Sequence, residues 1–191
     1  MVGDRGIVLA SASPRRAELL ASAGYRFTID AADVDETVHA GEDPQTYVLR
    51  VARDKARTVA RRGQHHDAVV LAADTTVVAG GEILAKPADE ADAIRMLQLL
   101  SDAVHDVWTG VVAVSDRQEA SDVVLTRVHL RAITPEEIRW YVASGEPMGK
   151  AGAYGIQGRA ARFIDWIEGS WSNVVGLPVA TVDRLLNRLG A

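Results

Sequence analysis

The sequence has no cysteine among its 191 residues. This absence excludes a disulfide, a thiolate nucleophile and any metal site built on cysteine. No apolar stretch approaches the roughly 20 residues that a membrane helix needs, so we expect no membrane contact. The apolar run near the N-terminus is too short for a signal peptide. These absences are compatible with the cytoplasm.

Lysine is also scarce, because only three of the 21 basic residues are lysines: Lys55, Lys86 and Lys150. Lysine is a compact point charge and arginine a planar fork, so the two are not interchangeable at a tight phosphate or carboxylate site. The formal net charge is −5, which argues against a surface that coats nucleic acid. An anionic ligand must therefore meet a local basic cluster.

Several catalytic motifs are missing as well. The sequence has no GxxxxGK[ST] loop, which excludes a P-loop nucleotidase, and no evident serine–histidine or cysteine–histidine arrangement. It has no internal repeat, low-complexity tract or linker, so we expect a single domain over residues 1–191. Strand patterns of parallel and hairpin type alternate with helical ones, which predicts an α/β fold with a mixed sheet.

The stretch from Val69 to Pro87 is the most informative one. The apolar run Val69–Ala73 fits a strand buried on both faces, and it ends on Asp74. A second apolar run, a Gly-Gly turn and Lys86 follow. A carboxylate at the end of a buried strand, with a lysine returning after a hairpin, is how α/β enzymes often present catalytic groups. Alternatively, Asp74 caps a turn, since aspartate is common where strands end.

Near the N-terminus, an expected strand over 6–10 leads through a small-residue turn into an expected helix. Ser13 is the predicted N-cap and Pro14 the first helical residue. Free backbone N–H groups, the positive helix end and the side chains of Arg15 and Arg16 would then meet in one place. This pattern predicts an anion site. The alternative is an ordinary strand–helix turn with two solvated arginines.

An acidic stretch follows at residues 33–36. Mg²⁺ prefers one or two carboxylates together with waters and substrate phosphates, and Glu36 is the best candidate ligand. A solvated acidic loop is the alternative. The expected helix over 44–62, with Asp43 as its N-cap, carries Lys55 in line with its apolar stripe. Lys55 therefore either extends outward past the core or points into a polar cleft.

The C-terminal half predicts further elements. We expect a helix over 89–100, an antiparallel hairpin of strands 105–114 and 122–133, a helix opened by the capping box at Thr134, a strand over 162–168 and a closing helix over 179–189. The segment 148–158 contains four glycines, a density that predicts a wall against a ligand, with Lys150 and Gln157 as its polar groups. The adjacent His65 and His66 lack an obvious third ligand, which argues against a metal site.

The polar residues without an evident core role form one chemical set. Five are cationic, two acidic and one neutral: Arg15, Arg16, Lys55, Lys86, Lys150, Glu36, Asp74 and Gln157. Such a set fits a polyphosphate hydrolase. The cations neutralise phosphate charge, one carboxylate holds Mg²⁺ and another activates water.

The motifs LASASPRRAELL, DVDE, RVARDKA, LAADTTV with AKP, DVWTG, KAGAYGIQG and VVGLP resemble those of the Maf family of nucleoside triphosphate pyrophosphatases. The resemblance runs in order over nearly the whole chain. It implies a Maf/inosine-triphosphatase-like α/β fold: a mixed twisted sheet with flanking helices, in two lobes around a cleft. It also implies a cytoplasmic homodimer that hydrolyses a nucleoside triphosphate to the monophosphate and pyrophosphate, with Mg²⁺ or Mn²⁺ as cofactor.

The same resemblance implies residue roles. Asp74 matches the family's proton acceptor, and with Glu36 it would hold the cation. Lys55, Lys86 and Arg16 match phosphate-contacting positions, the two lysines within the catalytic set. Positions tied to substrate binding and choice are matched by Ser11, Arg15, Thr75 and Gln157.

The SPRR, ADT and GIQG forms look like those of the subgroup that acts on dTTP and UTP rather than 7-methyl-GTP. A glutamine amide can pair with a pyrimidine edge as donor and acceptor. One departure is Gly149, where many members carry aspartate before the lysine corresponding to Lys150.

Two other functions stay open from the sequence. One is a catalytically weak regulator of septum formation that binds nucleotides or nucleic acid, since the resemblance includes an association with septation. The other keeps the pyrophosphatase reaction but directs it to purine or modified nucleotides. Intact Asp74, Lys55 and Lys86 argue for catalysis.

Overall fold

The fold was determined as a computed structural model, which describes residues 5–115 and 118–191. Its strands are β1 (Gly6–Leu9), β2 (Phe27–Ile29), β3 (Ala68–Ala79), β4 (Glu82–Leu84), β5 (Ala103–Val114), β6 (Glu119–Leu130) and β7 (Ile164–Glu168). Its helices are α1 (Pro14–Ser22), α2 (Pro44–Ala60), α3 (Glu90–Leu100), α4 (Pro135–Val142), α5 (Trp171–Val175) and α6 (Val179–Leu189), with 3-10 turns η1 (Ala151–Ala153) and η2 (Arg159–Phe163).

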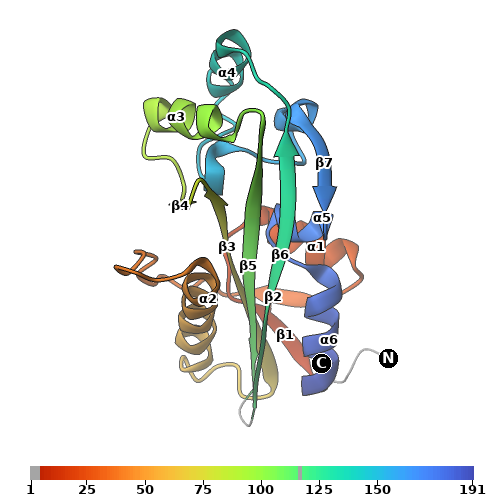
Figure 1. Cartoon of the computed structure of the whole chain (residues 1–191). Coiled ribbons are helices and arrows are strands. Elements are labelled where there is room, and N and C mark those ends of the chain that lie inside the picture. Colours follow the sequence, from red (N-terminus) through yellow and green to blue (C-terminus); the bar gives the residue numbers. More distant parts are fainter. Residues whose placement is uncertain (1–4, 116–117) are drawn as a thin grey trace. The chain divides into compact units, whose positions relative to one another are not determined.

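The strands form one mixed sheet in the order β2-β1-β3-β5-β6-β7, with β4 paired to β3 (Figure 1). β1 is parallel to both β2 and β3, whereas β4 is antiparallel to β3 and β7 to β6. The predicted fold class, α/β with a mixed sheet and flanking helices, is therefore confirmed. Among the described residues, no helix combines the length and the apolar character that crossing a membrane requires.

The chain divides into two compact units. Unit 1 comprises Met1–Asp74, Thr109–Val124 and Gly176–Ala191, and unit 2 comprises Thr75–Trp108 and Leu125–Val175. Strands β3, β5 and β6 each contribute residues to both units. On β3 the boundary falls between Asp74 and Thr75, so two predicted site residues that are neighbours in sequence belong to different units.

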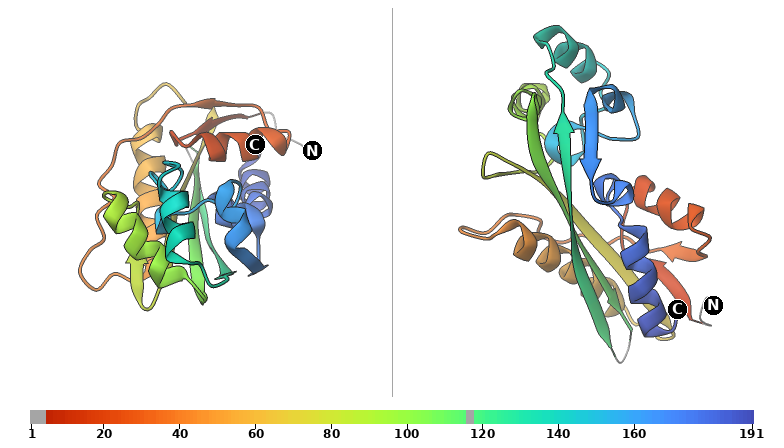
Figure 2. Two further views of the ribbon diagram at one scale, coloured as in Figure 1. Left: turned by 90° about the horizontal axis from the view of Figure 1, so that it is seen from above. Right: turned by 45° about the vertical axis from the view of Figure 1, so that its right-hand side comes forward.

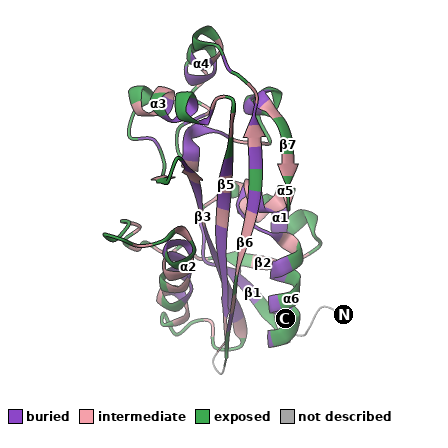
Figure 3. Cartoon of the chain, in the orientation of Figure 1, coloured by how far each residue is buried: buried purple, intermediate pink, exposed green. Residues whose placement is uncertain are grey.

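Unit 1 is built around the parallel strands β1, β2 and β3. One face of β1 and β3 packs against the apolar stripe of α2, with the buried residues Val8, Ala10, Ala52, Ala56, Val59, Val70, Ala72 and Val112. Figures 1 and 2 place α2 and α6 on opposite sides of these strands. No residue of β3 is exposed, as Figure 3 shows. A strand covered on both faces explains its near-continuous apolar sequence.

The close approach of β5 to α2 depends on Gly110. A Cβ atom at this position would lie 2.6 Å from both the carbonyl carbon and the carbonyl oxygen of Val48. These are backbone atoms of the helix α2, so they cannot move aside as the end of a flexible side chain could. The glycine of the DVWTG motif is thus required by packing.

Replacing Gly110 with alanine is expected to destabilise the protein by about 1–3 kcal/mol, because an added methyl group must push β5 away from α2. For a chain of this size that loss corresponds to a Tm lower by roughly 2–12 °C. Thermal unfolding followed by circular dichroism measures it. Gly6→Ala is the matched control, because its Cβ would meet Ala68 at an ordinary 3.9 Å. Equal Tm values for the two variants would contradict this account.

Unit 2 has its own core, in which α3 and α4 pack with the glycine-rich segment. His105 on β5 is buried within it, with Nε2 2.8 Å from the Tyr154 hydroxyl oxygen. Burial lowers the pKa of His105 to about 4, so the imidazole is neutral at pH 7. Gly152 is also buried here. Its φ is +65°, and a Cβ at this position would lie 2.9 Å from the side chain of Val77, so both the backbone conformation and the packing require glycine.

Several local predictions are confirmed and others are wrong. Asp43 caps α2 by accepting from the Thr46 N–H, and Thr134 forms its capping box with Glu137. Ser13 precedes α1 as predicted, but its side chain makes no capping bond. The predicted strand 122–133 lies three residues earlier as β6, and residues 116–117 of the predicted turn lie outside the described residues.

Candidate functional site

Asp74 lies in the middle of β3 and is only 6% exposed. The prediction that a strand ends at Asp74 is wrong, and so is the alternative that Asp74 caps a turn, because β3 continues to Ala79. A buried carboxylate needs a charged or hydrogen-bonding partner. That partner is Lys55 of α2, whose Nζ lies 2.7 Å from Asp74 Oδ1.

Lys55 is 7% exposed and bridges two carboxylates. Besides Asp74, its Nζ contacts Glu36 Oε1 at 2.6 Å. Of the two possibilities for Lys55, extension outward past the core is therefore wrong, because its ammonium is buried against two carboxylates. Glu36, Lys55 and Asp74 come from a loop, a helix and a strand of unit 1, and together they form what we call the acidic bridge.

The loop that carries Glu36 is fastened to α2. The Tyr47 hydroxyl donates to the Glu36 carbonyl oxygen at 2.9 Å. Arg50 donates from Nη2 to the Thr37 carbonyl oxygen at 2.9 Å and to Glu42 Oε2 at 2.8 Å, and from Nε to Glu42 Oε1 at 2.7 Å. The Arg50 side chain lowers the pKa of Glu42 to about 2, so this pair is ionised at neutral pH.

The carboxylates of the acidic stretch differ in exposure. Glu36 is half-buried and joins the acidic bridge, whereas Asp33 and Asp35 of the same stretch are exposed. Of the three carboxylates in the stretch, only the one favoured from the sequence is withdrawn from full exposure.

Arg16 is held rather than solvated. Its Nε donates to the Gly176 carbonyl oxygen at 2.8 Å, and its Nη1 donates to Ser11 Oγ at 3.2 Å. Ser11 is buried and also accepts from the Ser13 N–H at 3.2 Å. Burial lowers the pKa of Arg16, while the charges of Asp74 and Glu36 act in the opposite direction. Arg15 is half-buried in the first turn of the same helix, α1.

The acidic bridge has a donor set suited to a hard divalent cation. Glu36 and Asp74 supply carboxylate oxygens, and Mg²⁺ is bound in proteins through one or two carboxylates with waters and substrate phosphates. Among residues 5–115 and 118–191, no group of three or more acidic or histidine side chains could hold a metal ion. Two carboxylates beside an ammonium fit a cation that arrives with phosphate ligands of its own.

The remaining predicted site residues belong to unit 2. Thr75 is half-buried and follows Asp74 on β3, so the two side chains point to opposite faces of the strand. Lys86 is exposed in the segment after β4, and the neighbouring Ala85 carbonyl accepts from the Gly152 N–H at 3.2 Å. Gln157 is exposed within the turn that the Gly158 N–H closes onto the Gly155 carbonyl at 3.1 Å.

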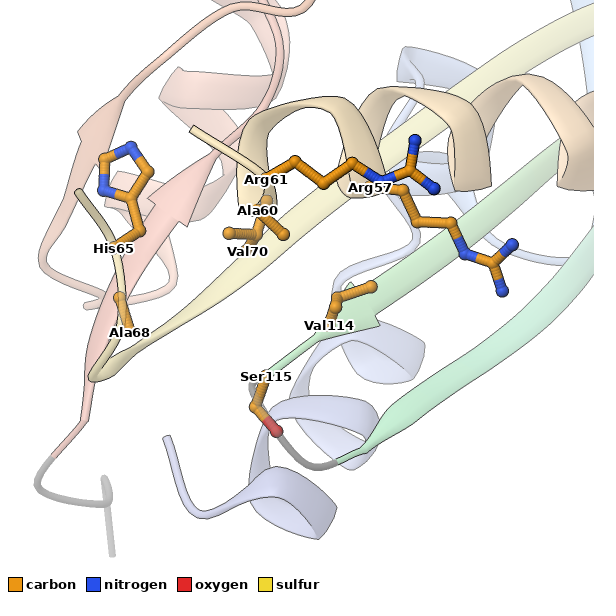
Figure 4. A pocket seen from close by; sticks show the side chains of 8 residues that line it. All are labelled: Arg57, Ala60, Arg61, His65, Ala68, Val70, Val114 and Ser115. Atoms are coloured by element: carbon orange, nitrogen blue, oxygen red, sulfur yellow. The ribbon is translucent and has the colours of Figure 1, made fainter. Parts of the chain in front are cut away.

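A cavity of about 310 Å³ lies elsewhere in unit 1, at the C-terminal end of α2 (Figure 4). Its lining residues are Arg57, Ala60, Arg61, His65, Ala68, Val70, Val114 and Ser115. It adjoins the first residues of β3, about 13–20 Å of strand length from Asp74. His65 Nε2 lies 2.8 Å from Asp30 Oδ2. This cavity contains none of the predicted site residues.

The sequence interpretation missed the residues that support Glu36. Tyr47 precedes Lys55 by eight positions, which places both on one stripe of α2, so helical spacing could have identified it. No local signal reveals the Glu42–Arg50 pair, because Glu42 lies in a loop and its partner on the helix.

Comparison with known proteins gives one consistent result. The family model described as Maf-like protein matches residues 6–189. The chain is 55% identical over 184 residues to the dTTP/UTP pyrophosphatase of Myxococcus xanthus, covering 96% of this chain and 92% of that protein. It is 51% identical over 185 residues to that of Koribacter versatilis, with 97% and 95% covered. It is 51% identical over 194 residues to that of Geotalea uraniireducens, with 100% and 98% covered.

Proposed function

The chain belongs to the Maf-like protein family, and from this premise we propose that it hydrolyses nucleoside triphosphates, dTTP and UTP foremost, to the monophosphate and pyrophosphate. The observation that supports this most directly is the acidic bridge. A buried carboxylate, Asp74, is held 2.7 Å from a buried ammonium within a chain whose relatives are named dTTP/UTP pyrophosphatases.

In the proposed reaction Asp74 is the general base. It accepts a proton from water as the water oxygen attacks the α-phosphorus, and the pyrophosphate group leaves. Lys55 holds the carboxylate in place through the 2.7 Å contact between its Nζ and Asp74 Oδ1. Its positive charge also favours the charge that develops on the phosphoryl oxygens.

The other proposed roles concern the nucleotide. Arg16 and Lys86 contact the phosphate chain, Lys86 as a member of the catalytic set with Asp74 and Lys55. Ser11 holds the guanidinium of Arg16 and borders the substrate. Arg15, Thr75 and Gln157 choose the base, since a glutamine amide offers a donor and an acceptor to a pyrimidine edge.

A divalent cation, Mg²⁺ or Mn²⁺, is part of the proposal. Glu36 and Asp74 would hold it, and it would supply Lewis-acid polarisation of a phosphoryl oxygen. We further propose that residues 1–191 act as a single catalytic domain, that the protein forms a homodimer, and that it works in the cytoplasm.

The proposal is tested by incubating the protein with dTTP, UTP, CTP, dATP and 7-methyl-GTP, with Mg²⁺ or Mn²⁺, and separating the products by ion exchange. We expect dTTP and UTP to give monophosphate and pyrophosphate, and chelation of the cation to stop turnover. In ¹⁸O-labelled water the label should enter the monophosphate, because the attack is at the α-phosphorus. Release of orthophosphate, or no turnover, would contradict the proposal.

A further inference from the structure

Glu146 is a half-buried residue whose carboxylate has one contact at each oxygen. The Tyr141 hydroxyl donates to Oε1 at 3.1 Å, and the Arg159 backbone N–H donates to Oε2 at 3.0 Å. Through these two hydrogen bonds the Glu146 carboxylate links the end of α4 to the start of η2. The four residues from Gly155 to Gly158 lie directly before that second attachment point, Arg159.

Tyr141 provides the other attachment. It is fully buried in the last turn of α4, and its ring packs edge-on against Phe163 with centroids 5.7 Å apart. Its hydroxyl oxygen accepts from the Gly155 N–H at 3.3 Å while the same group donates to Glu146. Burial raises the pKa of Tyr141, so the hydroxyl keeps its proton at every physiological pH.

The two attachments enclose Gln157. Gly155 is held from one side and Arg159 from the other, and the bond from the Gly158 N–H to the Gly155 carbonyl closes the turn between them. Gly158 allows the carboxylate to come close, because a Cβ there would lie 2.5 Å from Glu146 Cδ. Exposed Gln157 is thus carried on a turn whose two ends converge on one carboxylate–phenol pair.

Lys150 strengthens the same arrangement. Its Nζ donates to the Glu146 carbonyl oxygen, and its side chain lies so close to Gly155 that a Cβ there would be 2.9 Å from Lys150 Cε. This contact gives Lys150 a local structural role that does not require the acidic residue missing at position 149.

We propose that Glu146 and Tyr141 are positioning residues that fix the place of the Gln157 amide and thereby set the enzyme's choice of base. The proposal rests on the proposed function, in which Gln157 reads a pyrimidine edge. A donor–acceptor pair discriminates between bases only when its position is fixed, because an amide that can shift also adapts to the wrong base. Glu146 and Tyr141 act on Gln157 through the backbone of the turn that carries it.

The test compares Tyr141→Phe and Glu146→Gln with the wild-type enzyme. Tyr141→Phe keeps the buried ring and removes only the hydroxyl. We expect kcat/KM for dTTP to fall about 5- to 10-fold in each variant, the effect of about one lost hydrogen bond. The loss should appear in KM with kcat within twofold, and the preference for dTTP over dATP should fall by the same factor. Trp171→Phe, a change at an exposed aromatic residue outside this turn, is the control.

Two further measurements separate positioning from general stability. In a Gln157→Ala background, Tyr141→Phe should change the base preference no further, since the proposed effect acts through Gln157. Amide hydrogen exchange at Gly155 and Arg159 should accelerate in both variants. An unchanged preference in the single variants, or an equal added loss in the Gln157→Ala background, would overturn the proposal.

Failure of the proposed function gives a different result. A wild-type protein that turns over no nucleotide refutes the pyrophosphatase itself. The positioning role of Glu146 and Tyr141 is then tested by amide hydrogen exchange and by calorimetric binding of dTTP and dATP. It is overturned if the variants match the wild type in both measurements.

Discussion

Replacing Asp74 with asparagine is expected to lower kcat about 10²- to 10⁴-fold, because general-base catalysis contributes a factor of this size. The change removes the proton acceptor and keeps the shape of the side chain. Expressed as a barrier, the loss is about 3–5 kcal/mol. It is measured at saturating dTTP with Mg²⁺ or Mn²⁺, so that weakened binding does not enter the comparison.

Asp35→Asn is the matched control for this variant. It makes the same chemical change at an exposed carboxylate one residue from Glu36, and it should leave kcat within about twofold, because an exposed surface group contributes little. If Asp74→Asn retained kcat within threefold of the wild type while dTTP stayed saturating, Asp74 would not be the base.

Replacing Lys55 with methionine is expected to cost both stability and activity. The methionine fills a similar volume but leaves the carboxylates of Asp74 and Glu36 without their shared ammonium. Breaking a buried ion pair by removing one partner costs about 3–5 kcal/mol, since the remaining charge stays buried. The expected drop in Tm is roughly 6–20 °C, and thermal unfolding measures it.

A second substitution distinguishes lost pairing from lost packing. Adding Asp74→Asn to Lys55→Met removes the unpaired buried charge, so the double variant should be more stable than Lys55→Met alone. A double variant that is less stable than either single one would mean that the energetic coupling lies elsewhere. In that case the acidic bridge would not be the source of the loss.

Local chemistry made part of the fold predictable. Asp43 and Thr134 were identified as caps because the capping group and its target lie three residues apart, within reach of a pattern. The same reasoning was wrong for Asp74. A carboxylate inside a buried strand is unfavourable unless it is paired, and its partner comes from a different element, 19 residues earlier.

The candidate site was likewise predictable from the sequence in part. Motif resemblance identified Glu36, Lys55 and Asp74, and the structure brings them into contact within unit 1. Tyr47 and the Glu42–Arg50 pair were missed because they act on Glu36 through its loop, which no motif of the sequence records. The roles of Thr75, Lys86 and Gln157 stay predictions, which the nucleotide panel and the Gln157→Ala background examine.

The acidic bridge also has a consequence for the order in which ligands bind. In the free protein the ammonium of Lys55 is already the counterion of both carboxylates. A divalent cation that approaches alone meets this like charge, whereas one that arrives with a triphosphate brings negative charge that offsets the repulsion. Cation and nucleotide should therefore bind cooperatively, each raising the affinity of the other by the same factor. Under the proposed function, Lys55 would balance the charge of the two carboxylates until the metal arrives, and metal uptake would then depend on the presence of substrate.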